Sequence, residues 1–250
     1  IYGTTFDVAS TMNTAVSGSH GLTINQTTFA VDYGLIGNVR PIAYLTVNGS
    51  SNAVFKGSMT TVTGHTINTP ILLGGHTSLI ATGANAVITL NNTVDGINSY
   101  QLALNASGAG GAVTINGLIG NATTNTNKVT TLTVTGITTL NRDIYTTSNQ
   151  TYNGPVRLGG NRIIDSNAGT IQFASTLNAL SAGAQGLTIA GGGATTFTGA
   201  VGATAALAFL NETASGVANI NNNITTTGYQ SYAGNVIIGV AAGTTATLST

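Results

Sequence analysis

The chain has 250 residues, of which 5% are charged, against about 25% in an average soluble domain. Six basic residues balance six acidic ones, so we expect no nucleic-acid partner and no binding to anionic membranes. The absence of cysteine excludes disulfides and thiolate metal sites. No apolar run approaches the roughly 20 residues of a spanning helix, so we expect no membrane insertion, and the first ten residues contain no recognisable secretion signal.

Taken in chain order, the first predicted strands belong to a segment that recurs near the end of the sequence. Residues 4–74 align without a gap to residues 169–239, an offset of 165 positions. For example, "VASTMNTAVSGSHGLTI" at 8–24 corresponds to "FASTLNALSAGAQGLTI" at 173–189. The run at 203–214 could pass for a helix, but its counterpart places Pro41 opposite Ala206. Because proline breaks a helix interior, we predict strand there.

A shorter motif divides this offset into 85 and 80 residues. It reads "HTINTPILLGG" at 65–75, "QTYNGPVRLGG" at 150–160 and "QSYAGNVIIGV" at 230–240. In addition, 87–96 resembles 170–179, 139–146 resembles 219–226, and 243–250 resembles 3–10. Self-similarity at a fixed period is typical of stacked architectures. We therefore predict one continuous solenoid over 1–250, built from repeats of roughly 80–85 residues: a partial repeat at 1–64, repeats at 65–149 and 150–229, and a partial repeat at 230–250.

Apolar residues alternate with polar ones in short runs along the whole chain, which predicts half-buried strands. The clearest pairs are Val156/Leu158, Ile171/Phe173, Leu187/Ile189, Leu207/Phe209 and Val236/Ile238. Strands this short and this close together favour an all-β, parallel β-solenoid with coils of about 20 residues over tandem β-sandwiches. Coils stack about 4.8 Å apart, where charges would repel but Asn, Thr and Ser can hydrogen-bond along the stack.

The motif at 150–160 also predicts directions for its side chains. We expect Gln150 to lie at a turn, Tyr152, Val156 and Leu158 to point inward, and Arg157 to point outward. The same directions are predicted for the copies at 65–75 and 230–240.

Several of these segments resemble the repeats of large bacterial surface proteins of the filamentous haemagglutinin and autotransporter-adhesin type. The resemblance rests on "QTYNGPVRLGG", "GTIQFASTLN" (169–178), "QGLTIAGGGATTFTGAVG" (185–202) and "ITTTGYQSY" (224–232), and it covers essentially the whole chain. It implies a right-handed parallel β-helix and an extracellular location on the bacterial cell surface. It also implies a role in adhesion, biofilm or aggregation, with host or matrix glycans or proteins as partners, and it brings no catalytic residues.

Comparison between the internal copies argues against chemistry at the histidines. His20 corresponds to Gln185, and His65 corresponds to Gln150 and Gln230. A polar turn position explains both substitutions better than a catalytic role does. The third histidine, His76, has no acidic or nucleophilic partner that the sequence identifies.

The acidic residues and the Gly-rich segment give no site either. Asp143 lies opposite Asn223 and Glu212 opposite Val47, and no paired carboxylates for glycoside hydrolysis recur. The segment at 190–197 lacks the Lys-Ser/Thr of a phosphate-binding loop. We therefore predict that the chain is not an enzyme, that it has no catalytic, cofactor-binding or metal-binding residues, and that it needs no cofactor.

The leading functional hypothesis is a structural and adhesive filament segment that works by coil stacking and self-association. Its partner would be itself, either by head-to-tail stacking or by continuation of a longer chain. The main alternative is a passive β-helical stalk that presents a binding or catalytic domain outside these residues. A polysaccharide-acting β-helix enzyme would need clustered acids. An ice-binding surface would need Thr in every coil at one phase, and Ala208 at the position of Thr133 argues against it.

Overall fold

The computed structural model describes residues 2–3, 8–26, 31–96, 98–121, 129–240 and 245–250, and every regular element in these ranges is a β-strand. The chain divides into two compact units, residues 1–136 and 137–250. Among the described residues, no helix has the length and hydropathy required to cross a membrane.

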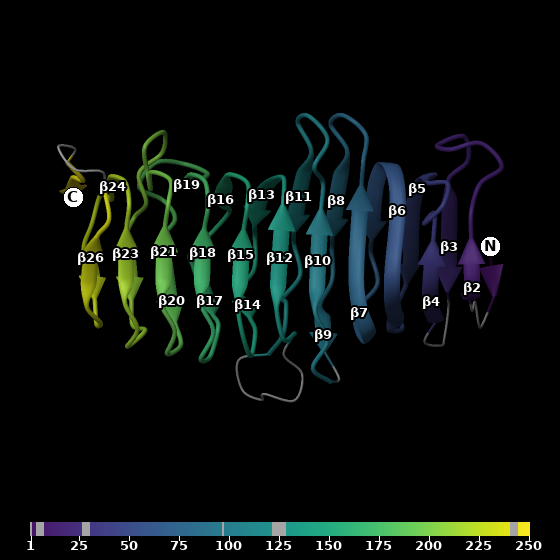
Figure 1. Cartoon of the computed structure of the whole chain (residues 1–250), viewed down its shortest axis with the longest axis horizontal. Coiled ribbons are helices and arrows are strands. Elements are labelled where there is room, and N and C mark those ends of the chain that lie inside the picture. The colour runs from purple at the N-terminus through teal and green to yellow at the C-terminus, as the bar shows by residue number, and fades with distance from the viewer. Residues whose placement is uncertain (1, 4–7, 27–30, 97, 122–128, 241–244) are drawn as a thin grey trace. The chain divides into compact units, whose positions relative to one another are not determined.

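The first unit contains twelve strands that pair in parallel ladders. One ladder joins β1, β3, β5, the second half of β6, β8 and β11, and another joins β2, β4, the first half of β6, β7, β10 and β12. Figure 1 shows β6, β7, β10 and β12 side by side. The strands are β1 (Tyr2–Gly3), β2 (Val8–Met12), β3 (Leu22–Gln26), β4 (Val31–Ile36), β5 (Ile42–Gly49), β6 (Ala53–Ile67), β7 (Ile71–Ala81), β8 (Val87–Leu90), β9 (Val94–Gly96), β10 (Leu102–Asn105), β11 (Ala112–Ile115) and β12 (Leu132–Thr135).

The second unit has three parallel ladders, so each coil contributes three short segments. They are β13–β16–β19, β14–β17–β20–β22–β25 and β15–β18–β21–β23–β26, and the first continues through bridges at Val201 and Ile224. The third ladder is visible in Figure 1 as a row of parallel arrows. The strands are β13 (Ile137–Leu140), β14 (Ile144–Tyr145), β15 (Gln150–Tyr152), β16 (Val156–Leu158), β17 (Arg162–Asp165), β18 (Ile171–Phe173), β19 (Leu177–Ala179), β20 (Leu187–Ala190), β21 (Thr195–Phe197), β22 (Leu210–Glu212), β23 (Ala218–Ile220), β24 (Ile224–Thr225), β25 (Gln230–Tyr232), β26 (Val236–Ile238) and β27 (Leu248–Ser249).

Both units are therefore β-solenoids, as the alternating sequence pattern predicts. Paired residues on adjacent coils lie between 18 positions apart, as for Thr138 and Val156, and 30 apart, as for Leu102 and Leu132. The strands keep their register while the turns absorb this variation in length. Parallel pairing of this kind leaves inward side chains stacked in columns, because strand residues alternate between the two faces.

The two copies of the repeated segment have the same ladder register, each within its own unit. Leu22 pairs with Leu45 and Leu45 with His65 in the first unit. Exactly 165 positions later, Leu187 pairs with Leu210 and Leu210 with Gln230 in the second. The sequence repeat is thus a repeat of coil geometry. The match between 3–10 and 243–250 lies partly outside the described residues.

The same turn also recurs in both copies, and an asparagine holds it. The Asn13 side-chain oxygen accepts the backbone N–H groups of Val39 and Arg40, both at 3.1 Å. Asn178 does the same for Thr204 and Ala205, at 3.0 and 3.3 Å. Each turn opens with a glycine at positive φ, Gly37 at 67° and Gly202 at 71°, a conformation that disfavours other residues.

Most of the predicted inward pairs are buried. Tyr152, Val156 and Leu158 are almost fully buried while Arg157 is exposed, as predicted, and the pairs Ile171/Phe173 and Leu187/Ile189 are buried too. Val236 and Ile238 are 40% and 47% exposed, because no described residue covers this end of their ladder.

Two predictions were wrong. Phe209 is not a core partner of Leu207, since the turn at Asn178 resets the alternation and Leu210 takes the buried position. Gln150 does not lie at a turn but is a buried residue of strand β15.

Candidate functional site

One outward face of the first unit carries two continuous columns of polar side chains, which we call the Thr–Asn face. It comprises the outward residues of β3, β5, the second half of β6, β8 and β11, where the sequence reads T-[IVL]-N five times. The five asparagines are Asn25, Asn48, Asn68, Asn91 and Asn116. Each amide nitrogen donates to the side-chain oxygen of the preceding asparagine, at 2.7, 2.6, 2.6 and 2.7 Å in chain order.

This asparagine ladder confirms the expectation that uncharged polar side chains hydrogen-bond along the stack. Four short bonds in series fix five coils at one register. Beside the ladder runs a column of threonines: Thr23, Thr46, Thr66, Thr89 and Thr114. The run at 131–135 behaves differently, because Thr133 pairs with Ala103 and does not continue a threonine column.

His65 is a core residue and not a turn residue, which corrects the sequence-based prediction. It lies in β6 between Leu45 and Ile88 and is 1% exposed. Its Nε2 lies 3.0 Å from the carbonyl oxygen of Ile80, so this nitrogen carries the hydrogen and donates it. Burial lowers the pKa of His65 to about 4, because a charged imidazole would lose its hydration.

The glutamines at the corresponding positions make an equivalent contact with a carbonyl of the next coil. The Gln150 amide donates to Asp165 O at 2.8 Å and to the Thr146 hydroxyl at 3.0 Å. The Gln150 side-chain oxygen in turn accepts the Tyr152 hydroxyl at 2.8 Å. Gln230 and Tyr232 repeat this bond at 3.1 Å. The position therefore serves to satisfy buried polar groups, which need hydrogen-bond partners.

The interior of the second unit holds a column of stacked rings. Tyr152 and Phe173 lie 5.1 Å apart with an interplanar angle of 9°, and Phe173 and Phe197 lie 5.5 Å apart at 2°. Each such contact contributes about 0.5–1.5 kcal/mol beyond the burial of its area. These aromatic residues are thus accounted for by packing.

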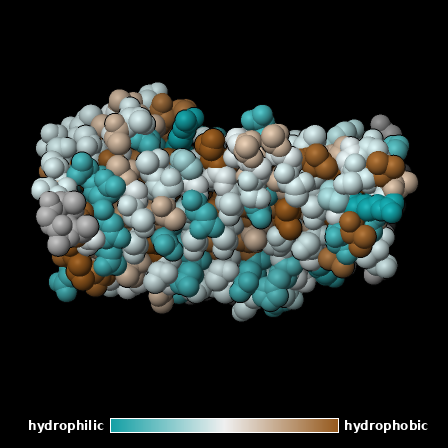
Figure 2. All heavy atoms as spheres, turned by 45° about the horizontal axis from the view of Figure 1, so that its top comes forward, coloured by the Kyte–Doolittle hydropathy of each residue, from teal (hydrophilic) through white to brown (hydrophobic). Residues whose placement is uncertain are grey.

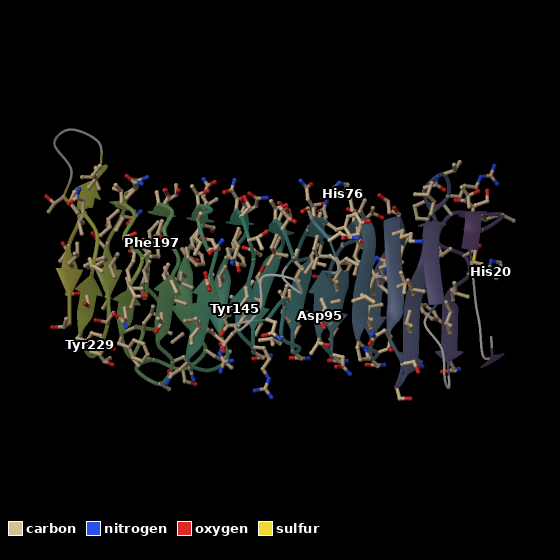
Figure 3. All side chains as sticks on the ribbon, turned by 90° about the horizontal axis from the view of Figure 1, so that it is seen from below. His20, His76, Asp95, Tyr145, Phe197 and Tyr229 are labelled. Carbon is tan, nitrogen blue, oxygen red and sulfur yellow. The ribbon has the colours of Figure 1, made fainter. Side chains whose placement is uncertain are left out.

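The remaining titratable residues are dispersed. Figure 3 shows His20, His76 and Asp95 well apart on different coils. His20 Nδ1 bonds only its neighbour, 2.6 Å from the Ser19 hydroxyl, and His76 packs edge-on against Tyr100 at 5.8 Å. Within the described residues, no group of three or more His, Asp or Glu side chains is placed to hold a metal ion.

Asp143 forms a separate contact on the second unit. Its carboxylate lies 3.5 Å from an Arg162 guanidinium nitrogen and accepts the backbone N–H of Ile163 at 2.9 Å. Both contacts tie adjacent coils together. The role is structural, like that of the asparagine ladder.

Glu212 is the one strongly buried carboxyl among the described acidic side chains. It is 1% exposed in β22 and occupies the core position that Val47 has in the first copy. Among the described residues neither carboxyl oxygen makes a hydrogen bond of normal geometry, although the nearby Thr195 hydroxyl slightly favours the charged form. Burial is the larger effect and raises the pKa of Glu212.

Two shallow hollows lie on the surface of the first unit. One of about 220 Å³ is lined by polar and small side chains around His76, including Ser58, Ser78, Gln101 and Thr133. The other, of about 230 Å³, lies on the Thr–Asn face and is lined by Tyr44, Thr46, Thr63, Gly64, Thr66 and Val87. Sequence reasoning identified neither hollow, because their residues come from separate coils.

Comparison with other proteins assigns no family. The chain matches no protein-family model, no curated protein and no solved structure.

Proposed function

We propose that this chain is a segment of an extracellular structural and adhesive fibre on a bacterial surface, acting by coil stacking and self-association and not by catalysis. The solenoid fold fits a structural stalk or repeat protein. The surface location and adhesive role rest on the resemblance of the repeats to those of filamentous haemagglutinin-like and autotransporter-adhesin-type proteins.

The observation that carries the proposal is the condition of strand β26. By register, Val236 and Ile238 continue the inward column of Ala218 and Ile220, which are buried. Val236 and Ile238 are instead 40% and 47% exposed. An edge strand with apolar side chains and unpaired backbone groups is a template for another strand. A further coil of the same polypeptide, or the first coil of another copy, would restore the burial.

The outer surface is compatible with close packing of fibres. On the face shown in Figure 2, near-neutral residues predominate and hydrophobic ones form small separate groups. With a formal net charge of zero, neighbouring fibres would repel one another little.

The proposal is tested by a pair of lysine substitutions in the 250-residue chain. Ile238→Lys puts a charge on the inward column of β26, whereas Ile237→Lys changes the outward, 52% exposed neighbour and is the matched control. We expect the parent chain and Ile237→Lys to form linear oligomers whose size rises with concentration in analytical ultracentrifugation, and Ile238→Lys to stay monomeric.

A parent chain that remains monomeric at every concentration would contradict self-association. Equal behaviour of the two lysine variants would show that any assembly uses another surface. Either result favours the alternative of a passive stalk for a domain outside these residues.

A further inference from the structure

The two copies of the repeat differ at one surface position, and the difference leaves a ring-sized space. In the second unit, Phe209 and Tyr229 occupy neighbouring coils, and their rings stack at 5.4 Å with an interplanar angle of 7°. The positions 165 residues earlier are Tyr44 and Gly64, which pair in the ladder of the first unit. Tyr44 thus has the place of Phe209, while nothing takes the place of Tyr229.

The supporting glycines show that the two rings lie in the same way. A Cβ atom added to Gly21 would meet the Tyr44 ring at 2.2 Å, and one added to Gly186 would meet the Phe209 ring at 2.3 Å. Each ring therefore lies over the glycine of the preceding coil. In the second unit the opposite side of the ring is covered by Tyr229, whereas in the first unit it borders the hollow of about 230 Å³ on the Thr–Asn face.

The backbone keeps this hollow open. Gly64 has a φ of 142°, and a Cβ atom there would lie 2.0 Å from the carbonyl oxygen of Val87. No side chain can fill the space from position 64 without moving a strand. Val87, which is 41% exposed, forms the wall opposite Tyr44, and Thr46 and Thr66 supply hydroxyl groups at the rim.

From this arrangement we infer that the hollow between Tyr44 and Val87 is a binding site for a flat, uncharged aromatic ring of the phenol type, which stacks on Tyr44 as Tyr229 stacks on Phe209. A cavity of about 150 Å³ can hold a benzene ring, so the space suffices. No charged side chain lines the hollow, which suits a neutral ligand, and the threonine hydroxyls suit a ring that carries a hydroxyl group. The inference does not depend on fibre assembly.

The experiment titrates p-cresol, the ring of a tyrosine side chain, into the 250-residue chain and follows backbone amide shifts by NMR. We expect saturable shifts at Gly64, Thr66 and Val87 with a dissociation constant on the order of millimolar. Tyr44→Ala should weaken binding roughly two- to tenfold, as expected for the loss of one ring contact. Tyr44→Phe should bind like the parent chain, because phenylalanine has this place in the second copy. Tyr44 is 45% exposed, so its truncation should leave the fold intact, which a thermal melt checks.

A reverse variant makes the test independent of Tyr44. Tyr229 is 56% exposed, and Tyr229→Gly should open the same space beside Phe209 and create a second p-cresol site with shifts near Leu210 and Gln230. Binding of N-acetyl-tyrosine methylamide tighter than p-cresol would assign a polypeptide tyrosine as the source of the ring, and equal binding would assign a free phenol. Equal binding of cyclohexanol, unchanged binding by Tyr44→Ala, or no second site in Tyr229→Gly would overturn the inference.

Discussion

Replacement of His65 by glutamine should remove an acid-sensitive point from the core of the first unit. The imidazole is buried and neutral, and burial lowers its pKa from 6.5 to about 4. In the unfolded chain it titrates near 6.5, so the unfolded state takes up a proton first as the pH falls. The stability associated with neutral His65 is complete above pH 6.5 and is lost progressively down to pH 4.

The size of the effect follows from this difference in pKa. Each unit corresponds to 1.36 kcal/mol, so the full loss is about 3 kcal/mol below pH 4 and about 2 kcal/mol at pH 5. Glutamine does not titrate, and it already occupies this position at Gln150 and Gln230. In His65→Gln it should reach the Ile80 carbonyl and the Thr61 hydroxyl, the counterparts of the Gln150 partners.

The assay is urea unfolding followed by circular dichroism at pH 7.5 and pH 5. The parent chain should lose about 2 kcal/mol more than His65→Gln between these two pH values. Taking the difference between the proteins cancels the titration of every other group. His20→Gln, at an exposed position, is the matched control and should respond to acid like the parent. Equal acid responses of the parent chain and His65→Gln would refute the burial of a neutral imidazole.

Three further predictions concern other parts of the structure. Burial raises the pKa of Glu212, so its stabilising neutral form is complete below pH 4.5 and is lost as the pH rises; Glu212→Gln should therefore be more stable at pH 7, by roughly 1 kcal/mol or more, and urea titrations should show the gain vanish near pH 4. Asn68 takes part in two ladder bonds and Asn25 in one, so Asn68→Ala should cost about 1–3 kcal/mol and Asn25→Ala about half as much in urea unfolding at pH 7; equal costs would show that the ladder does not stabilise the stack. Phe173→Ala, in the middle of the interior ring column, should cost about 3–5 kcal/mol, whereas Phe209→Ala on the surface should cost less than about 1.5 kcal/mol; thermal melts of both variants check this order.

The fold could be predicted from the sequence because its strands alternate cleanly. Val156 and Leu158 are buried and Arg157 is exposed, as period-two alternation requires. Alternation failed where a turn interrupts it, so Phe209 was assigned to the core although Leu210 is the buried residue. It also assigned inward positions to Val236 and Ile238 correctly, but burial there depends on a covering coil and not on the strand's own sequence.

The surface features could not be predicted in the same way. Successive asparagines of the ladder are 23, 20, 23 and 25 residues apart, so no fixed sequence period identifies the column. The ring-sized hollow requires the ladder register, since only that register places Gly64 beside Tyr44. His65 was assigned to a turn because glutamine and histidine are usually exposed, whereas carbonyl contacts with the next coil allow both residues to be buried.

The most direct test of the fibre account is electron microscopy of the native material at a resolution that separates individual strands. The account predicts an axial stack with a spacing of about 4.8 Å that runs without interruption past the coil formed by β25 and β26. Separate particles whose last coil is covered by a different kind of structure would contradict it.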